Sequence, residues 1–154
     1  MEISLVLALP RDGLSVPVVR RVLKQAMHAL GIDPVVTSDI ELALTEACTN
    51  VLDHAAEGEE YEVRAGINGG ECCIEVIDTG GGFDHGSHGF AEAAAGAESG
   101  RGIQLMRALV DRVSFTSRGD GTVVHLEKRL SWAEDAPIGR LAGARREKAG
   151  SPRR

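Results

Sequence analysis

The sequence is poor in aromatic residues, cysteine and cationic charge, and it lacks a long apolar run. Aromatic residues make up only 3% of the 154 positions, a shortage that points to no class of function. The three cysteines form no C-x-x-C pair, so neither a zinc site nor a disulfide framework is expected. The net charge of -6 argues against generic nucleic-acid binding and against docking on anionic lipid. No apolar run approaches the ~18 residues of a membrane span.

The N-terminal run and the overall composition favour a single cytoplasmic domain. The run ending at Pro10 has no cationic segment and is followed directly by charged residues, so a signal peptide is not expected. We therefore expect free thiols in a reducing cytoplasm. The length suits one domain. Contents of 43% hydrophobic and 26% charged residues are typical of globular proteins.

Charge and glycine are distributed unevenly along the chain. Residues 131–154 contain 6 basic and 3 acidic residues, a net charge of +3 (6 minus 3). We expect a folded domain over residues 1–130 and a basic, flexible C-terminal tail over 131–154, either simply solvated or serving as an interaction arm. Eight of the 19 glycines lie between Gly80 and Gly102, which indicates a loop where the backbone approaches a neighbour closely.

Hydrophobic periodicity predicts five strands and three helices. Ser15 is expected to cap the first helix, and Ser38 with Glu41 to form a capping box for the second. Short turns between strands imply antiparallel pairs, so the order predicts an α/β two-layer sandwich (α+β) with a mixed, mainly antiparallel sheet and helices on one face. Strands are expected at 2–9, 61–67, 71–77, 113–116 and 122–130, and helices at 15–30, 39–56 and 101–111.

A polar stripe interrupts the apolar second helix. Glu46 and Asn50, with Asp53 or His54 about one turn later, share one helix face. Burying a carboxylate beside an amide is costly unless both have partners. The stripe is therefore either a functional face or the exposed side of an amphipathic helix.

Asp78 ends an apolar strand and is followed by a run of glycines. A buried carboxylate at this place can accept a hydrogen bond from an exocyclic amine. Gly80 and Gly82, before Phe83, leave room for a flat ring beside the backbone. The alternative is an ordinary Asp-x-Gly turn.

A second glycine-rich segment, residues 99–103, opens the third helix. Exposed amides near Gly100 and Gly102 make an anion site at a helix N-terminus, to which Arg101 can add a charge-assisted contact. The alternative is a glycine-rich helix entry, with Ile103 facing inward. Neither a P-loop nor a dinucleotide fingerprint occurs.

Taken in order, these motifs resemble the nucleotide boxes of the histidine-kinase-like ATPases, the GHKL superfamily with the Bergerat fold. Residues 46–54 look like the N box, 78–83 and 100–102 like the two glycine boxes, and 121–122 like the closing glycine-threonine element. Within that superfamily, the residues around Arg20 and after Gly102 are most similar to the small bacterial anti-sigma factor serine/threonine kinases.

The resemblance implies a role for each matching residue. Asn50 would bind Mg²⁺ and Glu46 would be the general base. Asp78 would accept from the adenine amine of ATP, with Thr122 supporting it, and residues 84–99 would form a lid. The other positions placed at the nucleotide are Asp53, His54, Gly80, Gly82, Phe83, Gly100, Arg101, Gly102 and Ile103.

The resemblance also implies the activity. It predicts an ATP- and Mg²⁺-dependent kinase that sequesters a sigma factor and phosphorylates a serine on an anti-sigma antagonist protein, acting as a homodimer without direct contact to nucleic acid or membrane. Two alternatives stay open: a non-catalytic ATP-binding module whose lid order controls partner binding, and an ATPase subunit of another machine. Arg20 and Arg21 either contact an acidic partner or are solvated helix charges.

Overall fold

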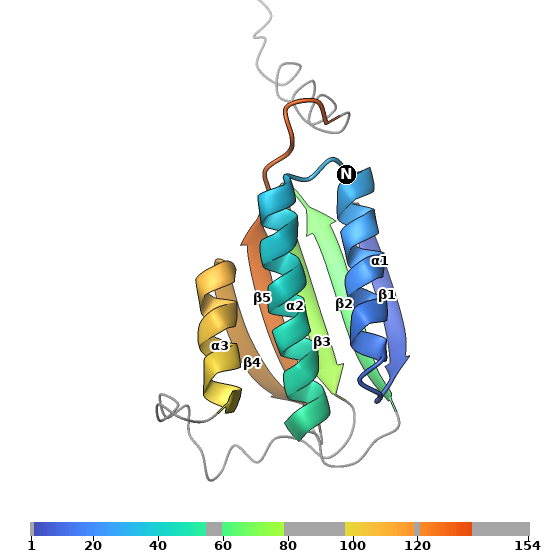
Figure 1. Cartoon of the computed structure of the whole chain (residues 1–154), viewed down its shortest axis with the longest axis vertical. Coiled ribbons are helices and arrows are strands. Elements are labelled where there is room, and N and C mark those ends of the chain that lie inside the picture. Colours follow the sequence, from blue (N-terminus) through green and yellow to red (C-terminus); the bar gives the residue numbers. More distant parts are fainter. Residues whose placement is uncertain (1, 55–59, 79–97, 119–120, 137–154) are drawn as a thin grey trace, which may run out of the picture.

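Figure 1 shows the computed structural model, which describes residues 2–54, 60–78, 98–118 and 121–136. All the predicted strands and helices are present in this part of the chain. The elements follow the order β1 (Glu2–Pro10), α1 (Ser15–Ala29), α2 (Pro34–His54), β2 (Glu60–Asn68), β3 (Glu71–Asp78), α3 (Glu98–Leu109), β4 (Arg112–Arg118) and β5 (Gly121–Arg129).

The five strands form one sheet in the order β1-β2-β3-β5-β4. The four pairings between these strands are all antiparallel. The three helices cover one face of the sheet, with α2 between α1 and α3 (Figure 1). The predicted two-layer α+β architecture is confirmed. Because β5 lies beside β3, the start of β5 is adjacent to the end of β3.

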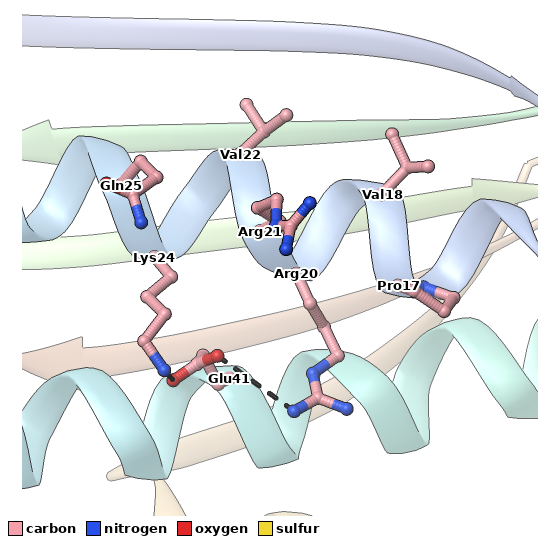
Figure 2. Close-up of a pocket in the computed structure, with 8 residues that line it drawn as sticks. All are labelled: Pro17, Val18, Arg20, Arg21, Val22, Lys24, Gln25 and Glu41. Carbon is pink, nitrogen blue, oxygen red and sulfur yellow. Dashed lines mark ion pairs between the residues drawn. The ribbon is translucent and has the colours of Figure 1, made fainter.

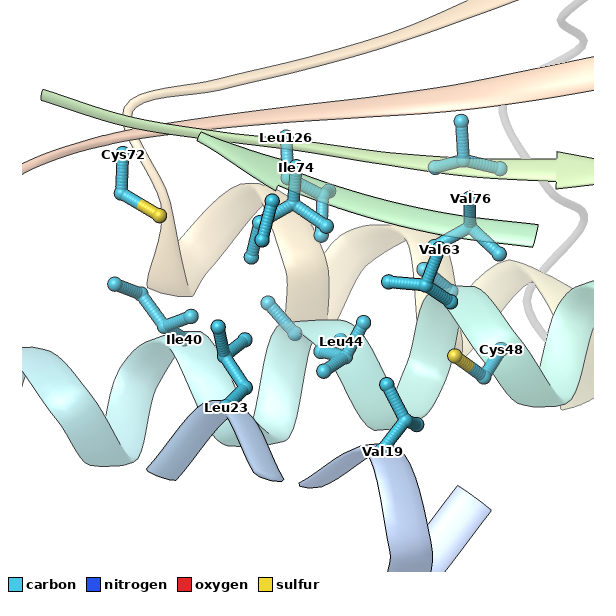
Figure 3. Close-up of a cluster of buried hydrophobic side chains, with 14 of the residues drawn as sticks. Val19, Leu23, Ile40, Leu44, Cys48, Val63, Cys72, Ile74, Val76 and Leu126 are labelled. Atoms are coloured by element: carbon cyan, nitrogen blue, oxygen red, sulfur yellow. The ribbon is translucent and has the colours of Figure 1, made fainter. Parts of the chain in front are cut away.

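The hydrophobic core fills the space between the sheet and the helices. Alternation along β2 buries Tyr61, Val63, Ala65 and Ile67 and leaves the residues between them more exposed. Figure 3 shows side chains of α2, Leu44 among them, directed toward the strands of the sheet. Removal of this apolar area from water, worth about 25 cal/mol per Å², is the main force that holds the helices on the sheet.

The three cysteines are free thiols, as predicted. Cys48 of α2 and Cys72 of β3 belong to the core, and burial raises the pKa of each thiol to about 12. Cys73 points to the opposite face of the sheet and is exposed.

The start of α1 differs from the prediction. Leu14 occupies the cap position and makes no side-chain cap hydrogen bond. Ser15 is buried, and its hydroxyl shares a 2.7 Å hydrogen bond with the Tyr61 hydroxyl. The prediction of a Ser15 cap was wrong because a buried phenol competes for the same oxygen.

The start of α2 also differs. The helix begins at Pro34, and Oδ1 of Asp33 accepts a hydrogen bond from the Val35 amide at 2.8 Å. Aspartate followed by proline is a helix-start signal that we overlooked. The predicted capping box of Ser38 and Glu41 is wrong, because both residues lie inside α2.

Residues 130–136, which we call the C-terminal strap, lie against the turn between α1 and α2. The Asp33 amide donates to the Ser131 carbonyl at 2.9 Å, and the Ala133 amide donates to the Gly31 carbonyl at 2.9 Å. The rest of the predicted tail, residues 137–154, lies outside the described residues. None of the described helices is long and apolar enough to cross a membrane.

Candidate functional site

Two buried polar residues face each other at one end of the sheet. Asp78 is the last residue of β3, Thr122 lies at the start of β5, and the strand register pairs them directly. Their exposed fractions are 1% and 0%. The alternation that buries Val76 opposite Val124 continues here with polar side chains. A carboxylate and a hydroxyl thus lie together on the helix-covered side of the sheet.

Arg11 reaches the same carboxylate from the turn between β1 and α1. Its Nη2 lies 3.2 Å from Oδ1 of Asp78 and donates to the Val51 carbonyl of α2 at 3.0 Å. The Arg11 side chain is only 10% exposed. The sequence analysis missed this residue, because a charged side chain after Pro10 is typical of a solvated turn and no local pattern marks a distant ion pair.

Tyr61 extends this polar group into the core. Its backbone pairs with Asp78 in the β2–β3 register, and its hydroxyl bonds with Ser15. Burial raises the pKa of Tyr61 to about 12, against the lowering effect of that hydrogen bond, and the neighbouring Cys48 side chain adds to the rise. The phenol therefore stays protonated at neutral pH.

The N box and the second glycine box meet where α3 packs against α2. A Cβ added at Gly102 would stand 2.9 Å from Oε2 of Glu46 and 3.5 Å from Oδ1 of Asn50. Glu46 is half-buried and Asn50 is buried. The glycine thus leaves room for two oxygen-bearing side chains on one helix face. The structure brings together three residues to which the family resemblance gives roles at the nucleotide.

The oxygen atoms at this point suit a hard divalent cation. Mg²⁺ is usually held by one or two protein oxygens together with substrate phosphates, rather than by a closed protein cage. The Asn50 amide oxygen supplies that donor chemistry, and the missing Cβ of Gly102 lets the Glu46 carboxylate lie beside it. These residues fit the predicted ion.

The other predicted site residues have different outcomes. Asp53 is exposed at the end of α2, and His54 is the last residue of that helix. Gly100 is buried in the first turn of α3, Arg101 beside it is exposed, and Ile103 packs against the core. Gly80, Gly82 and Phe83 lie outside the described residues, as does the predicted lid apart from its last two residues, which belong to α3.

A separate groove of about 710 Å³ lies over the outer surface of α1 and the facing side of α2. Figure 2 shows Lys24 and Arg20 reaching from α1 toward Glu41 of α2. Lys24 Nζ lies 3.2 Å and Arg20 Nη2 4.0 Å from the Glu41 carboxylate oxygens. With Arg21, the groove has three cations and one carboxylate, so it is basic in an otherwise acidic chain.

The sequence pattern of the histidine kinase-like ATPase domain matches residues 9–128, most of the chain. The chain belongs to the histidine kinase-like ATPase domain family. The matched range includes both polar clusters described above, the one around Asp78 and the one around Gly102.

Curated relatives of this ATPase domain have related names. The anti-sigma F factor of a Thermoanaerobacter species is 30% identical over 114 residues, covering 68% of this chain and 80% of that protein. The serine-protein kinase RsbW of Bacillus velezensis is 29% identical over 137 residues, covering 80% and 83%. That of Bacillus pumilus is 35% identical over 98 residues, covering 55% and 60%. The predicted resemblance to anti-sigma factor kinases is confirmed.

Solved structures share the fold of this ATPase domain. The crystal structure of the RsbU and RsbW domains of a Mycobacterium tuberculosis protein aligns with a TM-score of 0.67 at 23% identity. It covers 85% of this chain, which spans 33% of that longer chain. The histidine kinase domain of the blue-light activated kinase of Erythrobacter litoralis aligns with a TM-score of 0.53 at 19% identity, covering 79% and 62%.

Proposed function

We propose that the protein is an ATP-dependent anti-sigma factor serine/threonine kinase. It would sequester a sigma factor and phosphorylate a serine on an anti-sigma antagonist protein. The observation that carries this proposal is the close packing of Gly102 against Glu46 and Asn50, which places a carboxylate and an amide oxygen together beside the start of α3. Membership of the ATPase family and the names of the relatives support it.

The base of ATP would lie at the Asp78 end of the sheet. Adenine has an exocyclic amine, and a buried carboxylate is a strong acceptor for such a donor. Thr122, directly opposite in the register, would add its hydroxyl on the same side of the sheet. Gly82 would line the ring.

The phosphates would lie between α2 and the start of α3. Asn50 would hold Mg²⁺, which when bound neutralises phosphate charge. The first turn of α3, at Gly100 and Gly102, would direct backbone amides at the phosphates, with Arg101 adding charge. Glu46 would accept the proton of the serine hydroxyl. At the same time the serine oxygen would form a bond to the γ-phosphorus of ATP, and the bond between that phosphorus and the ADP oxygen would break.

The partners would be proteins met in the cytoplasm. The basic groove on α1 fits an acidic segment of the antagonist or of the sigma factor, because the three cations outnumber the single carboxylate. We further propose that the protein acts as a homodimer, and that residues 1–130 form the ATP-binding domain while 131–154 form a basic tail.

The test combines nucleotide binding with phosphoryl transfer. Calorimetric titration with MgATP is expected to show one site. Labelled ATP is expected to transfer phosphate to a purified antagonist protein, sought first among the products of the flanking genes. Glu46→Gln is expected to keep ATP binding and to slow transfer about 100-fold or more, since a general base contributes that much. Glu134→Gln, an exposed change on the C-terminal strap, is the matched control.

Two results would contradict parts of this proposal. A wild-type chain that does not bind ATP would overturn it as a whole. ATP binding without any phosphoprotein would favour the alternative, a non-catalytic module in which ATP sets partner affinity. Unchanged transfer in Glu46→Gln would remove Glu46 as the base and leave the rest standing.

A further inference from the structure

Arg11 is a charged side chain that the fold draws inward. It belongs to the turn between β1 and α1, where an arginine can easily extend into water, yet it is only 10% exposed. Burying a guanidinium is costly unless charged and polar partners compensate for the lost water. Its partners include the Asp78 carboxylate at 3.2 Å and the Val51 carbonyl at 3.0 Å.

The two partners belong to the two halves of the proposed nucleotide site. Val51 follows Asn50 in α2, and Asp78 ends β3. One guanidinium therefore joins the helix that would hold the phosphates to the strand that would hold the base.

The contact with Val51 also has a local reason. The last four carbonyls of a helix have no partner within it, and Val51 is the first of these in α2, which ends at His54. A cation at this end also interacts favourably with the helix dipole. Arg11 thus stabilises the C-terminal turn of α2 while it contacts Asp78.

The contact of Arg11 with Oδ1 of Asp78 favours the side-chain rotamers of Asp78 that keep this oxygen beside the guanidinium. A carboxylate has about four acceptor positions, so its ion pair with Arg11 is compatible with a further hydrogen bond from a base amine. The register already sets the backbone of Asp78 against Thr122. Rotation of the Asp78 side chain is a separate freedom, and the contact with Arg11 restricts it.

We propose that Arg11 is a positioning residue for adenine recognition, which holds the Asp78 carboxylate in the orientation that accepts the exocyclic amine and couples it to the N box on α2. This inference rests on the proposed ATP site. It adds Arg11, a residue of the turn between β1 and α1 that belongs to none of the nucleotide motifs.

The experiment compares MgATP with MgITP, which has a carbonyl where adenine has the amine, by calorimetric titration of the full chain. Wild type is expected to favour ATP by about 10-fold or more, the worth of one hydrogen bond to a charged group. In Arg11→Ala that preference is expected to fall toward equal binding. Arg11→Lys keeps the charge and is expected to retain part of the preference for ATP. Arg112→Ala, which removes a side chain that is 72% exposed, is the control and should match wild type.

The outcomes separate this inference from the proposed function. An unchanged ATP preference in Arg11→Ala, with ATP still bound, would overturn the role of Arg11 and leave the ATP site intact. No ATP binding by wild type would overturn both. If Arg11→Ala melts too low to be titrated, Arg11→Lys decides. Lysine keeps the charge but lacks the planar guanidinium that contacts Asp78 and the Val51 carbonyl together, so a full wild-type preference would contradict a role in orienting Asp78.

Discussion

Gly102 of α3 stands so close to Glu46 of α2 that a methyl group at position 102 would lie 2.9 Å from the Glu46 carboxylate oxygen. Ordinary contacts of a Cβ begin at about 3.4 Å, so the two groups cannot coexist unmoved. The atom in the way is the far end of a flexible side chain, not backbone. The glycine is therefore required by the position of the carboxylate more than by the fold.

Gly102→Ala is expected to separate activity from stability. The helix should tolerate alanine, which is a better helix former than glycine by up to about 1 kcal/mol. Glu46 would have to move away, so phosphoryl transfer should fall about 10-fold or more. Transfer assays and thermal unfolding of the same preparation measure the two effects. Gly66→Ala, where the nearest atom would be 3.9 Å away, is the control. Equal loss of stability and activity would contradict this interpretation.

Asn50→Ala is expected to weaken nucleotide binding in a magnesium-dependent way. If Asn50 holds the ion, the variant should lose about 10-fold in affinity for MgATP and little for ATP in excess chelator. Calorimetric titration with and without Mg²⁺ measures both values. A loss of the same size under both conditions would point to a packing defect instead.

Cys73 is expected to be the only thiol that reacts in the folded protein. Cys48 and Cys72 are buried, whereas Cys73 is exposed on β3. Partial burial and the carboxylates of Glu71, Glu127 and Glu75 raise the pKa of the Cys73 thiol, so labelling should be slow at neutral pH and faster as pH rises. Titration with a thiol reagent should count one group in buffer and all three in denaturant, and Cys73→Ser should abolish the native reaction.

The buried phenol of Tyr61 predicts a loss of stability in alkali. Its pKa rises from the ordinary value of 10.0 to about 12 in the folded state, so its contribution is complete below pH 10 and is lost as pH rises toward 12. Each pKa unit corresponds to about 1.4 kcal/mol. Denaturant unfolding between pH 9 and 12 should show this decline. Tyr61→Phe should make it shallower, at a cost of about 1–2 kcal/mol at pH 7 for the lost hydrogen bond.

The C-terminal strap is expected to contribute to stability through Trp132. The indole ring lies against Gly70 in the β2–β3 turn, where a Cβ added to the glycine would be 3.6 Å from the ring. Trp132→Ala should lower the free energy of unfolding by about 2 kcal/mol, since the side chain is half-buried. Trp132→Phe should lose much less, because the indole nitrogen has no hydrogen-bond partner among the described residues. An alanine variant as stable as wild type would show that the strap contributes no stability.

Local sequence patterns were enough to predict the helices and strands and the buried carboxylate at one end of the sheet. The apolar strand before Asp78 predicted a buried carboxylate at its end, and helical spacing placed Glu46 and Asn50 together. The meeting of those residues with Gly102 was predicted only through the resemblance to a known family, because it depends on how two helices pack. The sequence Asn-Gly-Gly at residues 68–70 is typical of a tight hairpin turn, and in the structure both glycines adopt positive φ, +59° and +90°.

The errors have two physical origins. The capping box of Ser38 and Glu41 fails because α2 begins earlier, at Pro34. Ser15 and Arg11 instead have distant partners, a tyrosine hydroxyl and a buried carboxylate. Periodicity and capping rules describe neighbours in sequence, so they cannot indicate which distant group competes for the same atoms.

The position of β5 between β3 and β4 has a consequence for synthesis of the protein. The last strand among the described residues, β5, completes the middle of the sheet, so Asp78 gains its neighbour Thr122 only after residues up to Arg129 have left the ribosome. Until then β3 is an open edge, and the nascent chain must remain unpaired there without aggregating. We expect chains arrested before β5 to be sensitive to protease and unable to bind nucleotide. Released chains are expected to become resistant to protease in one step.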